Sequence, residues 1–188
     1  AGDLFMESGF DATTVDDIAK AAGVAKLTVY NHFGDKERLF FEVIRNKTDI
    51  HTSEQFFKEF QGENPERELL DIGCAFMDLV FSDEAISMHR VIVAEGRKHP
   101  MLAVRFFEAA PEQLFLRLSQ YLVRLQGKHP FRFKDPVKAS KFFFGMLKGE
   151  AHLRAVLGLE PKESKENLRQ YAKDCVELFL NAHRMFEK

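Results

Sequence analysis

Apolar positions recur every three or four residues along almost the whole chain, a spacing typical of amphipathic helices. Few segments alternate apolar and polar residues as strands do, and glycine and proline mark the breaks between segments. The expected helices cover residues 1–9, 15–22, 27–33, 36–50, 136–157 and 164–185, and others start at Pro65, Asp83, Pro100 and Pro111. The pattern predicts an all-α protein of about nine helices.

The segment from Thr14 to Lys36 predicts two short helices joined by a tight turn, with another helix following at once. Thr14 can cap the first helix, and Asp17 three residues on gives a capping-box-like pair. Gly23 falls where this helix must end, because glycine adopts a left-handed backbone without a steric penalty. The apolar face of the second helix is expected to consist of Val24, Val29 and Phe33. This is the helix-turn-helix pattern, whose second helix enters the DNA major groove.

The same segment carries a specific motif. After the threonine at position 14 come an IA-x-x-AGV turn at Ile18–Val24 and a Y-x-HF-x-x-K exit at Tyr30–Lys36. In this combination the motif resembles the TetR family of transcriptional regulators. The resemblance implies a helix-turn-helix DNA-binding domain of three helices over residues 1–50, with the start of its first helix expected to be missing from this chain.

A second resemblance lies further along. The segment VIVAEGRKHP at Val91–Pro100 and the triplet Phe106-Phe107-Glu108 resemble the ligand domain of the AefR-like subgroup. This resemblance implies that residues 51–188 form a C-terminal helical bundle that binds a ligand and dimerises.

The expected DNA contacts lie on the exposed face of the second helix of the motif. Thr28 and Asn31 carry hydrogen-bonding groups suited to base edges, and Leu27 is suited to a thymine methyl group. The resemblance assigns Tyr30 and Lys36 to phosphates, whereas Thr14 is either a helix cap or a phosphate ligand. The predicted DNA-binding residues are Thr14, Lys26, Leu27, Thr28, Tyr30, Asn31, His32 and Lys36.

Charge gives this interpretation no support. The chain has a net charge of −2, which excludes a polycation that coats nucleic acid indiscriminately. Residues 1–50 carry nine acidic and six basic side chains. The prediction of DNA binding therefore depends on where particular residues are placed.

Phenylalanine is unusually frequent, with 20 Phe and no Trp in 188 residues. Phe brings a large apolar surface without a polar group, so a helical core explains most of these residues. A cavity for a small apolar or aromatic effector is the second interpretation, and sequence alone does not separate the two. The expected pocket residues are Phe76, Val80, Met88, Ile92, Phe107, Phe115, Leu118 and Phe143.

The last two long helices have apolar faces wider than one neighbouring helix requires. A four-helix interface between two copies of the chain is therefore expected, as in the family. Its predicted residues are Phe142, Met146, Gly149, Leu153, Leu168, Tyr171, Cys175 and Phe179. A two-fold dimer would present its recognition helices about 34 Å apart to a near-palindromic operator.

Other classes of protein are less consistent with the sequence. A ferritin-like metal enzyme needs Glu-x-x-His pairs that converge in the bundle, and the central helices have none. Glu95, Arg97 and His99 are interpreted as a solvated or hydrogen-bonded polar patch, and neither a metal site nor a cofactor is expected. A helical scaffold with a degenerate helix-turn-helix is the other alternative.

The two cysteines, Cys74 and Cys175, are expected to be buried and reduced, and no apolar run is long enough to span a bilayer. We therefore expect a cytoplasmic homodimeric repressor that a small molecule releases from a double-stranded DNA operator.

Overall fold

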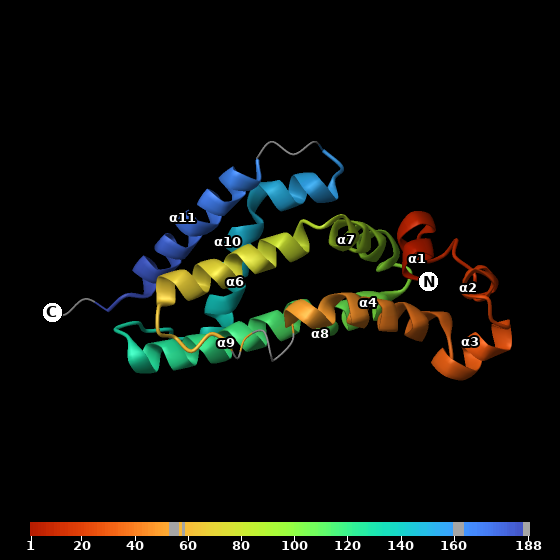
Figure 1. Cartoon of the computed structure of the whole chain (residues 1–188), viewed down its shortest axis with the longest axis horizontal. Coiled ribbons are helices and arrows are strands. Elements are labelled where there is room, and N and C mark those ends of the chain that lie inside the picture. The colour runs from red at the N-terminus through yellow and green to blue at the C-terminus, as the bar shows by residue number, and fades with distance from the viewer. Residues whose placement is uncertain (53–56, 58, 160–163, 186–188) are drawn as a thin grey trace. The chain divides into compact units, whose positions relative to one another are not determined.

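A computed structural model describes residues 1–52, 57, 59–159 and 164–185. The described residues form helices and no strand apart from one isolated bridge between Phe131 and Arg184. The predicted all-α class is confirmed. In chain order the helices are α1 (Gly2–Ser8), α2 (Val15–Ala22), α3 (Lys26–Phe33), α4 (Lys36–Thr52), α6 (Pro65–Val80), α7 (Asp83–Glu95), α8 (Pro100–Ala109), α9 (Pro111–Lys128), α10 (Pro136–Val156) and α11 (Lys165–His183) (Figure 1).

Side-chain caps set the start of several helices. Asn64 accepts a hydrogen bond from the Arg67 N–H at the start of α6, and a proline follows the cap directly. Asp135 does the same for the Lys138 N–H at the start of α10. Each cap satisfies a backbone donor that the first helical turn leaves free. The predicted cap-then-proline signals are confirmed.

The contacts within the chain divide it into two compact units. The first unit contains residues 1–50 and 83–111, and the second contains residues 51–82 and 112–188. Helices α7 and α8 thus pack with the N-terminal helices, whereas the division into functional domains 1–50 and 51–188 stays a prediction.

The core of the first unit shows why α7 belongs there. The rings of Phe5, Phe10 and Phe40 meet one another at centroid distances of 4.9–5.8 Å. Met88 and Ile92 of α7 are buried in the same cluster. Helices α1 to α4 alone would leave part of this apolar surface in water, so α7 completes the core.

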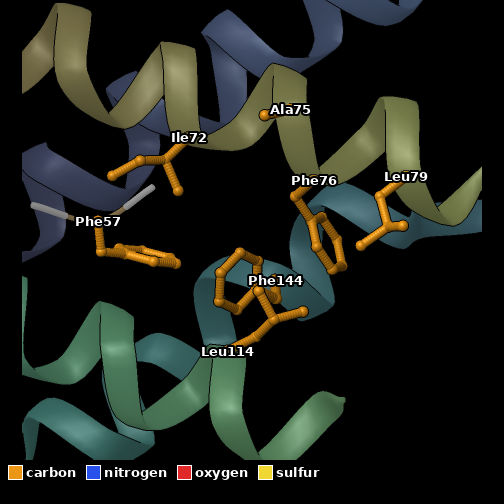
Figure 2. Close-up of a pocket in the computed structure, with 7 residues that line it drawn as sticks. All are labelled: Phe57, Ile72, Ala75, Phe76, Leu79, Leu114 and Phe144. Carbon is orange, nitrogen blue, oxygen red and sulfur yellow. The ribbon is translucent and has the colours of Figure 1, made fainter. Parts of the chain in front are cut away.

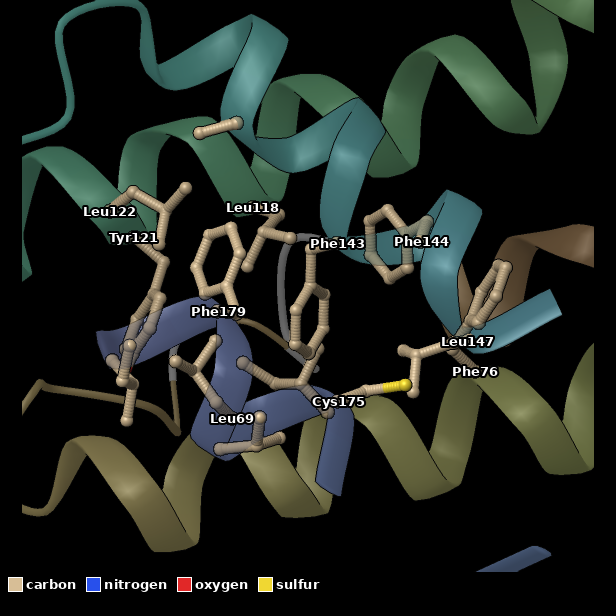
Figure 3. Packing of buried hydrophobic residues seen from close by; sticks show 14 of the residues in the cluster. Leu69, Phe76, Leu118, Tyr121, Leu122, Phe143, Phe144, Leu147, Cys175 and Phe179 are labelled. Carbon is tan, nitrogen blue, oxygen red and sulfur yellow. The ribbon is translucent and has the colours of Figure 1, made fainter. Parts of the chain in front are cut away.

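The second unit has its own core, made by α6, α9, α10 and α11 (Figure 3). Helix α6 packs against both α10 and α11, which also contact each other. Phe143 and Phe179 meet edge-on at 5.1 Å in the middle of this core. Most of the phenylalanines in the C-terminal half are therefore core residues.

Helix α10 was expected to be continuous over residues 136–157, but its backbone breaks at Gly149, where φ is 49° and ψ is −157°. The Tyr171 hydroxyl of α11 donates a hydrogen bond to the Met146 carbonyl at 2.8 Å. A Cβ atom at position 149 would lie 2.7 Å from the Tyr171 oxygen. Glycine is thus required both by the backbone angle and by the close approach of Tyr171.

Candidate nucleic-acid interface

Helices α2 and α3 form a helix-turn-helix within the first unit (Figure 1). Gly23 ends α2 in the left-handed conformation, with φ 68° and ψ 28°. Ile18, Ala19 and Val29 bury the facing sides of the two helices. Val24 does not belong to this apolar face as predicted, because it lies in the turn between the helices and is 44% exposed.

Helix α3 presents a continuous exposed face. Leu27 is the most exposed of its apolar residues, at 68% of its surface, and nothing in the fold of the unit buries it. Phe33, on the opposite side, is partly buried in the core. The exposed side chains are Lys26, Leu27, Thr28, Tyr30, Asn31 and His32. The structure thus gathers six of the eight predicted DNA-binding residues on one helix surface.

Lys26 is already paired on this surface. Its ammonium lies 2.6 Å from Asp16 Oδ2 at the start of α2, and both side chains are largely exposed. Hydrogen bonding to Asp16 raises the pKa of Lys26, and charge attraction to the same carboxylate adds to the effect. Asp16 therefore cancels much of the positive charge that Lys26 would present to a phosphate.

Lys36 has a structural position that its sequence did not reveal. Its Nζ atom donates to the carbonyls of Phe10 and Thr13 at 2.8 and 3.1 Å, and it lies 4.4 Å from the centre of the Phe10 ring. These contacts hold the connection between α1 and α2. A phosphate contact by Lys36 stays a prediction, and it would have to share an ammonium that these carbonyls already engage.

Thr14 forms a complete capping box. Its hydroxyl accepts a hydrogen bond from the Asp17 N–H, and the Asp17 carboxylate accepts one from the Thr14 N–H, both at 3.1 Å. The Thr14 hydroxyl also donates to Asp17, and these bonds lower the pKa of that carboxyl. The capping interpretation of Thr14 is therefore correct, and a phosphate role would be additional to it.

Replacing Thr14 by alanine is expected to lower the free energy of unfolding by about 1 kcal/mol. Thr14→Ser should retain most of it, and Thr28→Ala, on the exposed face of α3, should have little effect. Because the pKa of Asp17 is lowered in the fold, its contribution is present above its ordinary pKa and lost as the pH falls through the folded-state value. Urea denaturation of the three variants at neutral and acid pH checks this. Equal stability of Thr14→Ala and wild type would contradict the capping role.

The second unit contains a very small apolar cavity of about 10 Å³ (Figure 2). Its lining side chains come from α6, α9, α10 and Phe57, and they carry no polar group. They are Phe57, Ile72, Ala75, Phe76, Leu79, Leu114 and Phe144. The cavity is smaller than the 300–1,000 Å³ typical of ligand pockets, so a drug-sized ligand would require these side chains to move apart.

The predicted pocket residues are divided between the two units. Phe76 lines the cavity, and Val80, Phe115, Leu118 and Phe143 pack in or against the surrounding core. The remaining three are corrections. Met88 and Ile92 are buried in the core of the first unit, and Phe107 is 49% exposed on α8. Helical spacing predicted that these residues are apolar neighbours but did not specify which core each one joins.

The predicted dimer residues show a similar mixture. Phe142 and Leu153 of α10 are 56% and 59% exposed, and Tyr171 of α11 is also exposed. Gly149 is exposed, whereas Met146 and Leu168 are partly buried against the core of the second unit. Cys175 and Phe179 are wrong as interface residues, because both are buried inside that core. Leu178 of α11 is exposed in their place.

Both cysteines are free thiols, and burial raises the pKa of each. A high thiol pKa disfavours the reactive thiolate, so neither cysteine has the properties of a nucleophile. Among the described helices, none combines the length and apolarity that crossing a membrane requires.

Helices α2 and α3 form a helix-turn-helix motif whose second helix is exposed, and the chain continues as a helical bundle. This combination defines the class of helix-turn-helix regulators. Family comparisons agree with this class. A model described as "Bacterial regulatory proteins, tetR family" matches residues 1–43, and one described as "AefR-like transcriptional repressor, C-terminal domain" matches residues 67–185. Because the second match alone covers more than half of the chain, the chain belongs to the TetR family. Both resemblances predicted from its motifs are confirmed.

Solved structures extend the similarity to the whole chain. A TetR-family transcriptional regulator from Mesorhizobium loti is 26% identical with a TM-score of 0.87, over 98% of this chain and 93% of that one. The Flavonoid-responsive Regulator FrrA is 31% identical with a TM-score of 0.79, over the same shares. The HTH-type transcriptional repressor KstR2 of Rhodococcus jostii is 47% identical over 49 residues, 26% of this chain and 24% of that protein. The chain thus matches about a quarter of the length of such curated relatives.

Proposed function

We propose that this chain is a cytoplasmic, dimeric transcriptional repressor that leaves a palindromic operator when a small apolar effector binds. The observation that carries the proposal is the exposed face of α3, held outward by the buried contacts of Ile18, Ala19 and Val29. An exposed leucine flanked by Lys26 and Thr28 is hard to explain by stability, and it suits a groove that presents both methyl groups and hydrogen-bonding edges.

The cavity of the second unit supports an apolar effector. Its lining contains three phenylalanine rings and no charged or hydrogen-bonding side chain, so binding would be driven by apolar burial and ring stacking. The similar regulator FrrA is described as flavonoid-responsive. A flavonoid is a flat aromatic molecule, so this description is consistent with an effector that stacks on phenylalanine rings. The effector shifts the equilibrium between DNA-binding and released states only by its difference in affinity for the two.

The exposed apolar residues of α10 and α11 support the dimer. Phe142, Leu153 and Leu178 are large, apolar and more than half exposed in the single chain. Two copies related by a two-fold axis would bury these residues and present two α3 helices to two half-sites.

In-vitro selection of DNA sites with the full chain tests the proposal. We expect a palindrome whose half-site centres are about 34 Å or somewhat more apart. An effector found with this DNA should raise the apparent operator dissociation constant and leave the dimer intact. Selection of no sequence would contradict the proposal and favour the scaffold alternative, and a single asymmetric site would contradict the dimeric readout.

Asn31 and Tyr30 are expected to have different effects on DNA binding. Asn31→Ala should change the preferred base at one position of each half-site, where a good contact discriminates by about 1–3 kcal/mol. Tyr30→Phe removes only a hydroxyl expected on a phosphate, so it should weaken binding to all sequences together. Binding isotherms on the selected site, its single-base variants and random DNA measure both effects.

The matched control is Asn46→Ala, an exposed asparagine of α4 away from the predicted contacts. It should bind DNA as wild type does. An Asn31→Ala variant that loses affinity equally for every sequence would show that Asn31 contacts the backbone and not a base.

A further inference from the structure

Three side chains with metal-ligating atoms meet in the first unit, outside the predicted DNA-binding face. Asp11 lies in the connection between α1 and α2, Glu95 is the last residue of α7, and His99 immediately precedes α8. One ligand atom from each lies within 4.8 Å of the other two. Because Asp11 is far from Glu95 and His99 in sequence, the sequence pattern predicts only a polar patch on the later segment.

The backbone fixes two of these residues as a pair. The His99 N–H donates to the Glu95 carbonyl at 2.8 Å, and the Lys98 N–H donates to the same carbonyl at 2.9 Å. This turn ends α7 and brings the Glu95 and His99 side chains toward Asp11. His99 Nε2 lies 2.7 Å from Asp11 Oδ1, and the His99 ring rests edge-on against Phe10 at 5.1 Å.

The carboxylate of Glu95 provides a second, independent observation. Its Oε2 atom is buried from solvent and has no hydrogen-bond partner among the residues that the structure describes. A buried carboxylate oxygen without a partner is costly, since burial removes its water and nothing replaces it.

We propose that Asp11, Glu95 and His99 bind one divalent transition-metal ion of the zinc type. Two carboxylates and one imidazole form a mixed oxygen and nitrogen set that suits zinc and related ions better than magnesium, which prefers oxygen ligands. Metal–ligand bonds of about 2.0–2.2 Å place ligand atoms about 3.3 Å apart in a tetrahedron. Asp11 and His99, now 2.7 Å apart, would separate slightly, and the other ligand atoms, which lie within 4.8 Å, would move closer. The Glu95 oxygen gains a partner in this arrangement.

The surrounding charges set the affinity of the site. The Lys98 ammonium lies 3.1 Å from Asp11 Oδ2, and Glu37 Oε1 lies 3.9 Å from His99 Nδ1. Lys98 opposes a cation at this position, whereas Glu37 can orient the histidine ring and raise its basicity. The ion must also replace the hydrogen bond between His99 and Asp11.

The metal would join two segments of the first unit. Asp11 lies just before the capping box of α2, and Glu95 and His99 belong to the turn between α7 and α8. A bound ion would therefore stabilise the helix-turn-helix against local opening. Because it binds the folded unit and not the unfolded chain, it should raise the melting temperature by about 5 °C or more at a hundredfold excess over its dissociation constant.

Titration of the metal-free full chain with Zn²⁺, in competition with a chromophoric chelator, tests the site. We expect one Zn²⁺ per chain and far weaker binding of Mg²⁺. Each of the variants Asp11→Asn, Glu95→Gln and His99→Gln should weaken Zn²⁺ binding by about tenfold to a hundredfold. Glu7→Gln, an exposed carboxylate of α1 outside the cluster, should not change it.

Lys98→Gln separates a metal site from a merely structural cluster. It removes the opposing ammonium and should tighten Zn²⁺ binding, although it also removes an ion pair from the metal-free fold. Absence of stoichiometric binding, equal affinity for Mg²⁺, or Zn²⁺ binding unchanged in all three ligand variants would overturn the proposal. These measurements involve no DNA, so their outcome is independent of the operator experiments.

Discussion

Replacing Phe40 with alanine is expected to lower the free energy of unfolding by about 3–5 kcal/mol. Phe40 is completely buried, and its ring meets Phe5 edge-on at 4.9 Å and Phe10 at 5.3 Å. Natural domains are stable by about 5–15 kcal/mol, so this loss would remove a large fraction of such a stability. Operator binding should fall with it, because α2 and α3 are held by the same core. Urea denaturation followed by circular dichroism measures the change.

The neighbouring residue provides the control. Phe41 is only partly buried, and its ring lies 5.7 Å from the Arg105 guanidinium at the surface of the same unit. Phe41→Ala should therefore lower the free energy of unfolding by much less than Phe40→Ala. Equal effects of the two substitutions would show that the aromatic cluster does not organise this core.

Replacing Phe142 and Leu153 together with aspartate is expected to convert the proposed dimer into a monomer and to weaken operator binding by at least a hundredfold. Both side chains are exposed in the single chain, so the substitutions should leave its fold intact. In the dimer they would bury two unpaired carboxylates per chain at an interface where single residues contribute about 2 kcal/mol or more. Sedimentation equilibrium and operator titration measure the two losses.

Val123→Asp supplies the comparison. Val123 is an exposed apolar residue of α9 in the same unit, but it lies on neither α10 nor α11. This variant should dimerise and bind DNA as wild type does. If the double variant stays a dimer, or if Val123→Asp is the one that dissociates, the two chains meet on another face.

Local chemistry explains why the helix boundaries were predictable. A capping side chain and the backbone N–H that donates to it lie within three residues, as for Thr14 with Asp17, Asn64 with Arg67 and Asp135 with Lys138. Gly23 was likewise identified from its position at the end of an apolar pattern. The same helical spacing predicts the exposed face of α3, so most of the candidate DNA-binding surface could be predicted from the sequence.

Contacts between segments far apart in the chain could not be predicted from the sequence. Periodicity shows that Met88 lies on an apolar helix face, but not that this face packs against α1 and α4. Nothing in the sequence pairs Asp11 with His99, or directs the Lys36 ammonium to the carbonyls of the α1–α2 connection. Each of these contacts depends on the way the helices pack.

The errors on α10 and α11 have a related cause. Cys175 and Phe179 are four residues apart and share a helix face, which sequence identified as apolar without showing that it faces the core. Gly149 looked like a small residue for close helix packing. The break at this position became visible only with the Tyr171 hydroxyl beside the Met146 carbonyl.

The ion pair between Lys26 and Asp16 has a consequence for how the protein searches a genome. Non-specific affinity for DNA comes mainly from counterions released by unpaired basic groups, and here a basic group on the candidate reading surface is already neutralised. A chromosome offers about 10⁶–10⁹ competing sites, so weak sequestration leaves a larger fraction of the molecules free to sample the operator. We therefore expect this surface to release about one counterion fewer, so that non-specific DNA binding depends somewhat less steeply on salt.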